Sequence, residues 1–126
     1  MSVAAKAKST LQPLSDQEIQ SNYQRMQGDL QGLAQKIGEL ESESDEFGLV
    51  LATLEEALGE EPGRKCFRLI GGVLVERTVK DVVPALQTNR EGIRRMIATL
   101  VEQYKSKETD FDTFKRDYNI RPVNRA

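Results

Sequence analysis

The chain of 126 residues contains no histidine, no tryptophan and only one cysteine. The absence of histidine removes the most common metal ligand of proteins and their usual general base near neutral pH. A single cysteine, Cys66, cannot form a disulfide within the chain, and its place in a predicted strand favours a role as a small apolar packing residue. There is also no glycine-rich phosphate loop, nucleophile constellation or metal-ligand spacing. The sequence therefore predicts a protein that is not an enzyme and needs no cofactor or metal.

Long apolar runs are missing as well. No segment approaches the ~20 consecutive apolar residues that a membrane-spanning helix needs, and the opening MSVAAKAKST lacks the apolar region of a secretory signal. Charged residues make up 30% of the chain and hydrophobic residues 38%, a balance that suits paired helices better than a thick core. We expect a cytoplasmic protein without a membrane partner.

The charges are unevenly distributed along the chain. Residues 15–61 are strongly acidic, with Arg25 and Lys36 as their only basic residues, whereas residues 84–126 carry a basic excess. Such segments favour pairing with each other or between copies, and neither is typical of a nucleic-acid-binding surface. A group of carboxylates without histidine or cysteine partners is interpreted as a solvated helix face: Glu39, Glu41, Glu43, Asp45 and Glu46.

The apolar residues that are present follow two long ladders. Their spacing alternates between four and three residues, which is the pattern of a coiled coil. The first ladder is apolar except at Ser44 and consists of Ile19, Tyr23, Met26, Leu30, Leu33, Ile37, Leu40, Ser44, Phe47, Leu51, Leu54 and Leu58. The second ladder is interrupted by two basic residues, whose charges we expect to point outward, and consists of Val83, Leu86, Arg90, Ile93, Ile97, Leu100, Tyr104, Lys107, Phe111, Phe114 and Tyr118.

Local signals mark the ends of these helices. Ser15 and Glu18 form a capping-box pattern, and Gly59 is interpreted as the residue that ends the first helix. Thr78–Asp81 resembles a second helix start, after which Pro84 either restarts or kinks the helix. We expect a flexible tail over 1–14, a helix over 15–59, a loop and hairpin over 60–78, a helix over 79–121 and a tail over 122–126.

Between the ladders, two runs rich in apolar and β-branched residues flank Gly71-Gly72. Glycine at both positions suits a type I′ turn, so residues 65–78 predict a β-hairpin. The hairpin would be apolar on both faces, and a lone two-stranded hairpin is marginal in water. We therefore expect it to be the site of assembly with other chains, through Cys66, Phe67, Leu69, Ile70, Gly71, Gly72, Val73, Leu74 and Val75.

The two ladders are equally long and can be paired antiparallel, with Leu58 against Val83 and Tyr23 against Tyr118. The predicted fold is mainly α: a long antiparallel two-helix coiled coil with one β-hairpin at the connecting end. Aromatic residues gather at the free tip of this object. They either close the coiled coil or expose apolar surface to other chains. We refer to this set as the aromatic cluster: Ile19, Tyr23, Met26, Phe111, Phe114, Tyr118 and Ile120.

The sequence also resembles a known family. Residues 65–86, together with Tyr23–Met26 and Asn119–Arg121, closely resemble the β-type subunits of prefoldin, and the resemblance covers about residues 15–121. It implies a hetero-hexamer of α-type and β-type subunits joined through their hairpins. It further implies an ATP-independent co-chaperone that captures unfolded actin and tubulin between its coiled-coil tips and passes them to the cytosolic group II chaperonin. The aromatic cluster would then be the client-binding tip.

The sequence also allows two other interpretations. A coiled-coil scaffold or tether would share the helices but would hold no unfolded client. A nucleic-acid-binding helical arm would show strongly salt-dependent RNA binding, although the acidic first helix argues against it.

Overall fold

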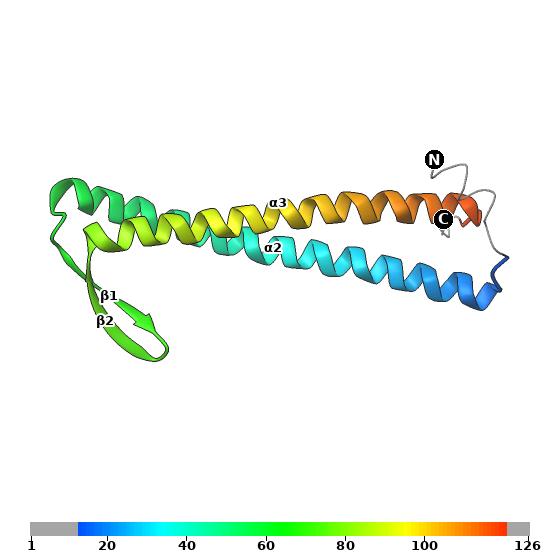
Figure 1. Ribbon diagram of the computed structural model, residues 1–126, viewed down its shortest axis with the longest axis horizontal. Helices are drawn as coiled ribbons and strands as arrows, with labels where there is room; N and C mark the ends of the chain where they lie inside the picture. Colours follow the sequence, from blue (N-terminus) through cyan, green and yellow to red (C-terminus); the bar gives the residue numbers. More distant parts are fainter. Residues whose placement is uncertain (1–12, 121–126) are drawn as a thin grey trace, which may run out of the picture. The chain divides into compact units, whose positions relative to one another are not determined.

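The computed structural model describes residues 13–120. Helix α2 (Asp16–Glu60) is followed by strands β1 (Lys65–Ile70) and β2 (Val73–Thr78) and by helix α3 (Val79–Asp117) (Figure 1). This confirms the predicted fold class, an antiparallel two-helix coiled coil with a β-hairpin in the connection. Of the two predicted tails, residues 1–12 and 122–126 lie outside the described residues.

Two parts of the chain pack as separate units. The first runs from Leu33 to Tyr104 and contains the hairpin. The second combines the chain before Leu33 with the chain after Tyr104, and its described residues are 13–32 and 105–120.

In the Leu33–Tyr104 unit, a small apolar core joins the C-terminal part of α2 to the start of α3. Val79 is the most deeply buried of its members, at 1% exposure. Leu58 and Val83, predicted to face each other, both belong to this cluster. Its buried members are Leu51, Val79, Val82, Val83 and Leu86, with Phe47, Leu54, Ala57, Leu58 and Cys66 packed against them.

The two polar ladder positions of this unit meet across the helices. Arg90 Nε donates a hydrogen bond of 3.0 Å to the backbone carbonyl of Ser44, and Ser44 is itself buried. A Cβ on Gly48 would lie only 2.7 Å from Arg90 Nη2. The prediction that Arg90 keeps its charge outside is therefore wrong, because the missing side chain at Gly48 lets the guanidinium turn onto α2.

Helix α2 begins as its sequence predicts and ends slightly later. Ser15 Oγ accepts a hydrogen bond of 3.1 Å from the Glu18 amide, and the Ser15 amide donates one of 3.2 Å to Glu18 Oε1. This confirms the capping box. At the other end α2 continues to Glu60, so Gly59 is not the residue that ends the helix. A hydrogen bond of 2.7 Å from the Glu61 amide to the Ala57 carbonyl extends its last turn.

The start of α3 is held by the loop before the hairpin. The Val79 amide donates to the Arg64 carbonyl at 2.9 Å, which satisfies one of the donors that a helix leaves unpaired at its N-terminus. The Thr78 hydroxyl also contacts Asp81 Oδ2 at 3.0 Å. Pro84 lies inside the helix, so the helix begins at Val79 and does not restart at the proline.

Helix α3 ends in a Schellman motif that the sequence analysis did not predict. Asn119 has a φ of 55°, its amide donates to the Arg116 carbonyl at 3.2 Å, and the Ile120 amide donates to the Lys115 carbonyl at 2.7 Å. Asparagine is one of the few residues besides glycine that accept this left-handed conformation. The helix therefore ends at Asp117, before the predicted end at residue 121.

Candidate functional surfaces

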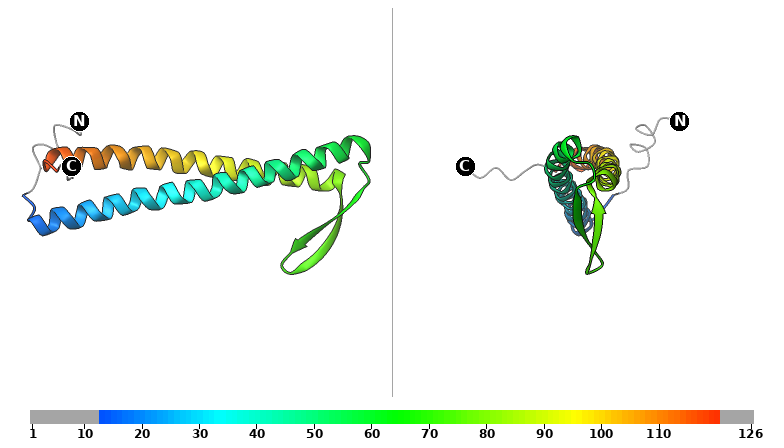
Figure 2. Two further views of the ribbon diagram at one scale, coloured as in Figure 1. Left: turned by 180° about the vertical axis from the view of Figure 1, so that it is seen from behind. Right: turned by 90° about the vertical axis from the view of Figure 1, so that its left-hand side faces the viewer.

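The hairpin has the predicted register and turn. Gly71 and Gly72 have φ values of 56° and 82°, and both are positive, as a type I′ turn requires. The paired residues next to the turn are Ile70 with Val73, Leu69 with Leu74, and Arg68 with Val75. Figures 1 and 2 show the ribbon projecting from α2 and α3, with its turn away from both helices.

The two faces of the hairpin differ in burial. On one face, Phe67, Leu69 and Leu74 are 63%, 69% and 65% exposed. On the other face, Cys66 packs against the apolar core, while Ile70 and Val73 near the turn remain about half exposed or more. Within residues 13–120, nothing covers the first face. The predicted assembly residues thus form an exposed apolar surface, apart from Cys66 and the half-buried Val75.

In the unit formed by residues 13–32 and 105–120, the structure brings members of the aromatic cluster together. The rings of Tyr23 and Phe111 are 5.1 Å apart, and those of Phe114 and Tyr118 are 4.9 Å apart. Lys115 Nζ lies 4.6 Å from the centre of the Phe111 ring, a cation–π contact. Phe111 is only 7% exposed. The cluster closes part of the coiled coil in this conformation, which is the first of the two predicted alternatives.

The helix register in this unit differs from the uniform register expected from the ladders. The Tyr23 ring contacts the Phe111 ring at a tilt of 52°, rather than the ring of the predicted partner, Tyr118. Asp29 likewise reaches Lys107, which stands at a ladder position but is polar. We attribute the offset to these two contacts, because a large ring pair and an ion pair can fix the local register where the apolar ladder is interrupted.

The remaining members of the aromatic cluster line two openings. Ile19, Tyr23 and Ile120 surround an open cavity of about 250 Å3, together with Asp16 and Gln20. Its wall is made mainly of apolar side chains. The half-buried Met26 lines a second cavity of about 180 Å3 with Arg25, Asp29, Lys107 and Asp110. Apolar side chains of this unit are thus reachable from solvent at Ile19 and Ile120, but not at Phe111.

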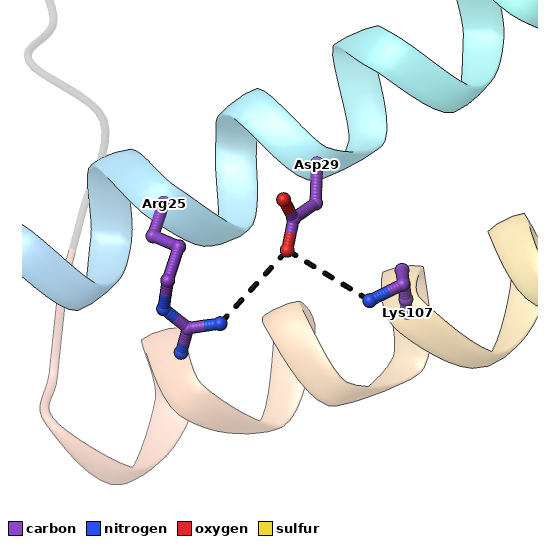
Figure 3. Close-up of polar contacts among 3 residues, drawn as sticks. All are labelled: Arg25, Asp29 and Lys107. Atoms are coloured by element: carbon purple, nitrogen blue, oxygen red, sulfur yellow. Dashed lines mark ion pairs between the residues drawn. The ribbon is translucent and has the colours of Figure 1, made fainter.

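The second opening carries a small charge network. Asp29 lies between two cations, with Arg25 Nη1 at 3.9 Å and Lys107 Nζ at 3.7 Å from Oδ2 (Figure 3). All three side chains are at least 42% exposed. Solvent-exposed pairs of this kind contribute about 0–1 kcal/mol, so they add little to stability.

Some exposed apolar residues were missed by the sequence analysis. Leu49, Val50 and Met96 are 73%, 49% and 51% exposed. Leu49 and Val50 are apolar residues between the ladder positions Phe47 and Leu51, where a heptad leaves the outer face polar. That departure from the pattern was the available signal.

The carboxylates interpreted as a solvated face are indeed exposed on α2: Glu39, Glu41, Glu43, Asp45 and Glu46. In the described part of the chain, no group of three or more metal-ligating side chains comes together. No helix between residues 13 and 120 is both long and apolar enough to cross a membrane.

The fold and the uncovered hairpin define a class of protein, the two-helix coiled coil whose connection is a β-hairpin. Comparison with known proteins narrows this class. The family model described as "Prefoldin subunit" matches residues 17–124. The chain therefore belongs to the prefoldin family of chaperone subunits, and the resemblance read from its hairpin is confirmed.

Individual relatives cover most of the chain. It is 43% identical to human "Prefoldin subunit 2" over 108 residues, which is 86% of this chain and 68% of the human protein. It is 45% identical over 112 residues to "Probable prefoldin subunit 2" of Schizosaccharomyces pombe, covering 89% of this chain and 96% of that protein. A third relative, "Prefoldin subunit 2" of Arabidopsis thaliana, is 36% identical over 110 residues, 87% of this chain and 72% of the relative.

Proposed function

We propose that this chain acts as the β-type subunit 2 of a hetero-hexameric, ATP-independent prefoldin in the cytoplasm. In this role it joins other α-type and β-type subunits through its hairpin. The complex captures unfolded polypeptides, actin and tubulin among them, and transfers them to the cytosolic group II chaperonin. The names of the relatives support the subunit type.

The observation that carries the assembly proposal is the uncovered face of the hairpin. Phe67, Leu69 and Leu74 are all more than 60% exposed on a sheet that has only two strands among the described residues. An isolated hairpin of this kind is marginally stable, and its free edges invite pairing with other strands. Burial against the hairpins of other subunits would remove both liabilities.

The client-binding part of the proposal concerns the aromatic cluster. Ile19 and Ile120 line the open apolar cavity described above, whereas Phe111 is buried against Tyr23. We propose that the open cavity makes the first contact and that the rings become available when the helix ends separate. One such contact is weak, but several coiled coils acting on one chain raise the avidity through effective concentration.

The test of assembly is the native mass and subunit content of the complex isolated through a tagged copy of this chain. We expect a particle made of several similar small chains, with this chain as one component. A stable homodimer without other small subunits would contradict the proposal.

The alternative, a coiled-coil scaffold that holds no client, needs a second measurement. The assembled complex should slow the aggregation of denatured actin without ATP. A complex of the correct composition that leaves aggregation unchanged would favour the scaffold.

A further inference from the structure

In the unit formed by residues 13–32 and 105–120, the two helices pack poorly over one stretch. On α3, every residue from Lys105 to Asp110 is exposed, and Phe111 is the first buried one after them. Elsewhere in α3 no more than three consecutive residues are exposed. A ladder position, Lys107, falls inside this stretch, so the regular packing of a coiled coil is interrupted there.

An open cavity marks the same place. It has a volume of about 180 Å3 and is lined by Arg25, Met26 and Asp29 of α2 and by Lys107 and Asp110 of α3. We call this cavity the polar gap. Met26 is its only apolar member, and Figure 3 shows the Lys107 ammonium reaching toward the Asp29 carboxylate. Space that a coiled coil normally fills with apolar side chains is therefore left open here.

The contacts across the polar gap are weak. Lys107 Nζ lies 3.7 Å from Asp29 Oδ2, which is beyond hydrogen-bond length, and the two side chains are 49% and 42% exposed. The contact between the other polar ladder positions differs, because Arg90 donates a hydrogen bond of 3.0 Å to the carbonyl of the buried Ser44. An exposed ion pair contributes less than a buried apolar side chain does, so the polar gap lowers the local stability of this unit.

The polar gap lies next to the aromatic cluster. Phe111 follows Lys107 by about one helical turn and is only 7% exposed, with its ring against that of Tyr23. For a client to reach this ring, the helix ends must first separate. Segments that open locally are drawn from the least stable parts of a fold, and proteins often keep such segments less stable than they could be when function needs the motion.

We infer that the polar gap, through Lys107, sets how often these two helix ends separate and so controls how readily the aromatic cluster receives a client. The inference rests on the proposed client capture and adds the residue that regulates it. Lys107 acts here without touching the client, because it keeps the closed form less stable than an apolar ladder residue would. A site whose open form is less populated binds with an apparent affinity that is lower by the same factor.

The test replaces Lys107 with leucine, whose apolar side chain can fill the polar gap against Met26. Lys105→Leu is the matched control, since Lys105 lies in the same exposed stretch but neither occupies a ladder position nor lines the gap. Each variant is assembled with the other subunits, and complexes of native composition are compared. Hydrogen exchange of peptides from residues 105–117 measures the opening. The amount of complex that suppresses the aggregation of denatured actin without ATP measures capture.

We expect Lys107→Leu to slow hydrogen exchange over residues 105–117 by about tenfold, because opening now exposes a buried side chain. The amount of complex needed for equal suppression should rise by about threefold, less than the change in opening, because the other coiled coils still contribute to avidity. For Lys105→Leu both values should stay within about twofold of native, since its side chain remains outside the ladder. A residue with a purely structural role would not lower capture when its replacement makes the unit more stable.

Several results would overturn the inference and leave the proposed function in place. Unchanged exchange in Lys107→Leu would show that the polar gap does not control opening, and slower exchange with native capture would show that opening is not needed. Stronger capture would show that the added apolar side chain binds the client itself. If the native complex does not slow aggregation at all, the proposed client capture is wrong and the inference fails with it.

Discussion

At Gly48, the absence of a side chain allows the Arg90 guanidinium to lie against α2 and to hydrogen-bond the Ser44 carbonyl. Glycine in a helix normally costs about 1 kcal/mol relative to alanine. Here the cost is offset by a hydrogen bond from a charged donor, a type of bond that contributes about 1.5–3 kcal/mol. Ser44 and Arg90 therefore form a polar layer in an otherwise apolar ladder, and such layers can fix the register of a coiled coil.

Substitution of two glycines in α2 should separate these effects. Gly38→Ala should stabilise the protein by about 1 kcal/mol, because a Cβ there would meet nothing within 4 Å. Gly48→Ala should raise the free energy of unfolding by less than Gly38→Ala does, or even lower it, because its Cβ would displace the Arg90 guanidinium. Urea unfolding followed by circular dichroism measures both.

The control for this prediction is the Arg90→Ala background, in which the two glycine substitutions should give equal gains. Equal gains in the native background would show that the Arg90 contact contributes nothing to stability.

Among the elements, the hairpin depends most on backbone conformation. Gly71→Asn should preserve assembly, because asparagine accepts a positive φ and precedes glycine in many type I′ turns. Gly71→Val should weaken it, since a β-branched residue at a φ of 56° is strained by about 1–3 kcal/mol. Co-purification of the other subunits with a tagged copy measures the difference. Equal recovery of subunits by both variants would contradict the prediction.

The elements also show what a sequence can predict. Both helices, the hairpin register and the capping box depend on short, regular patterns of residue types, so they were predicted correctly. The end of α3 was not, because it depends on the conformation of Asn119, which residue type alone does not determine. The prediction that Gly59 ends the first helix was also wrong, because glycine permits a helix to end but does not require it.

The candidate surfaces were predicted less completely. The exposed hairpin face follows from the alternation of residues along two strands. The exposure of Val50, and the groove that it lines together with residues of β1 and α3, depend instead on how the hairpin lies against the helices. The register near Phe111 also differed, because a ring contact and the Asp29–Lys107 pair replaced the regular ladder. Such features arise from packing between distant segments.

For the molecule as a whole, the complementary charges of the two helices form few direct contacts. Within the described residues, Asp29 with Lys107 is the only ion pair that joins α2 to α3. The buried residues of the described chain are apolar except for Ser44. The aromatic cluster and the hairpin belong to different packing units. These two surfaces should therefore be separable by mutation.

Phe111→Ser combined with Phe114→Ser should weaken client capture by the complex and leave its subunit composition unchanged, because it removes two rings that become available to a client when the helix ends separate and leaves the hairpin untouched. Suppression of actin aggregation by the purified complex measures this. Met96→Ser is the control, since Met96 is 51% exposed on α3 and belongs to neither surface. Normal capture by the double variant, or loss of assembly, would contradict the assignment of the cluster.

The hairpin also has a consequence for a newly synthesised copy of the chain. Until partners cover Phe67, Leu69 and Leu74, the molecule displays the features that mark an incompletely folded polypeptide, a free strand edge and an exposed apolar patch. A surplus copy would thus present itself to the quality-control machinery of the cell as a substrate. Its steady-state abundance should follow the supply of its partner subunits, more closely than its own rate of translation.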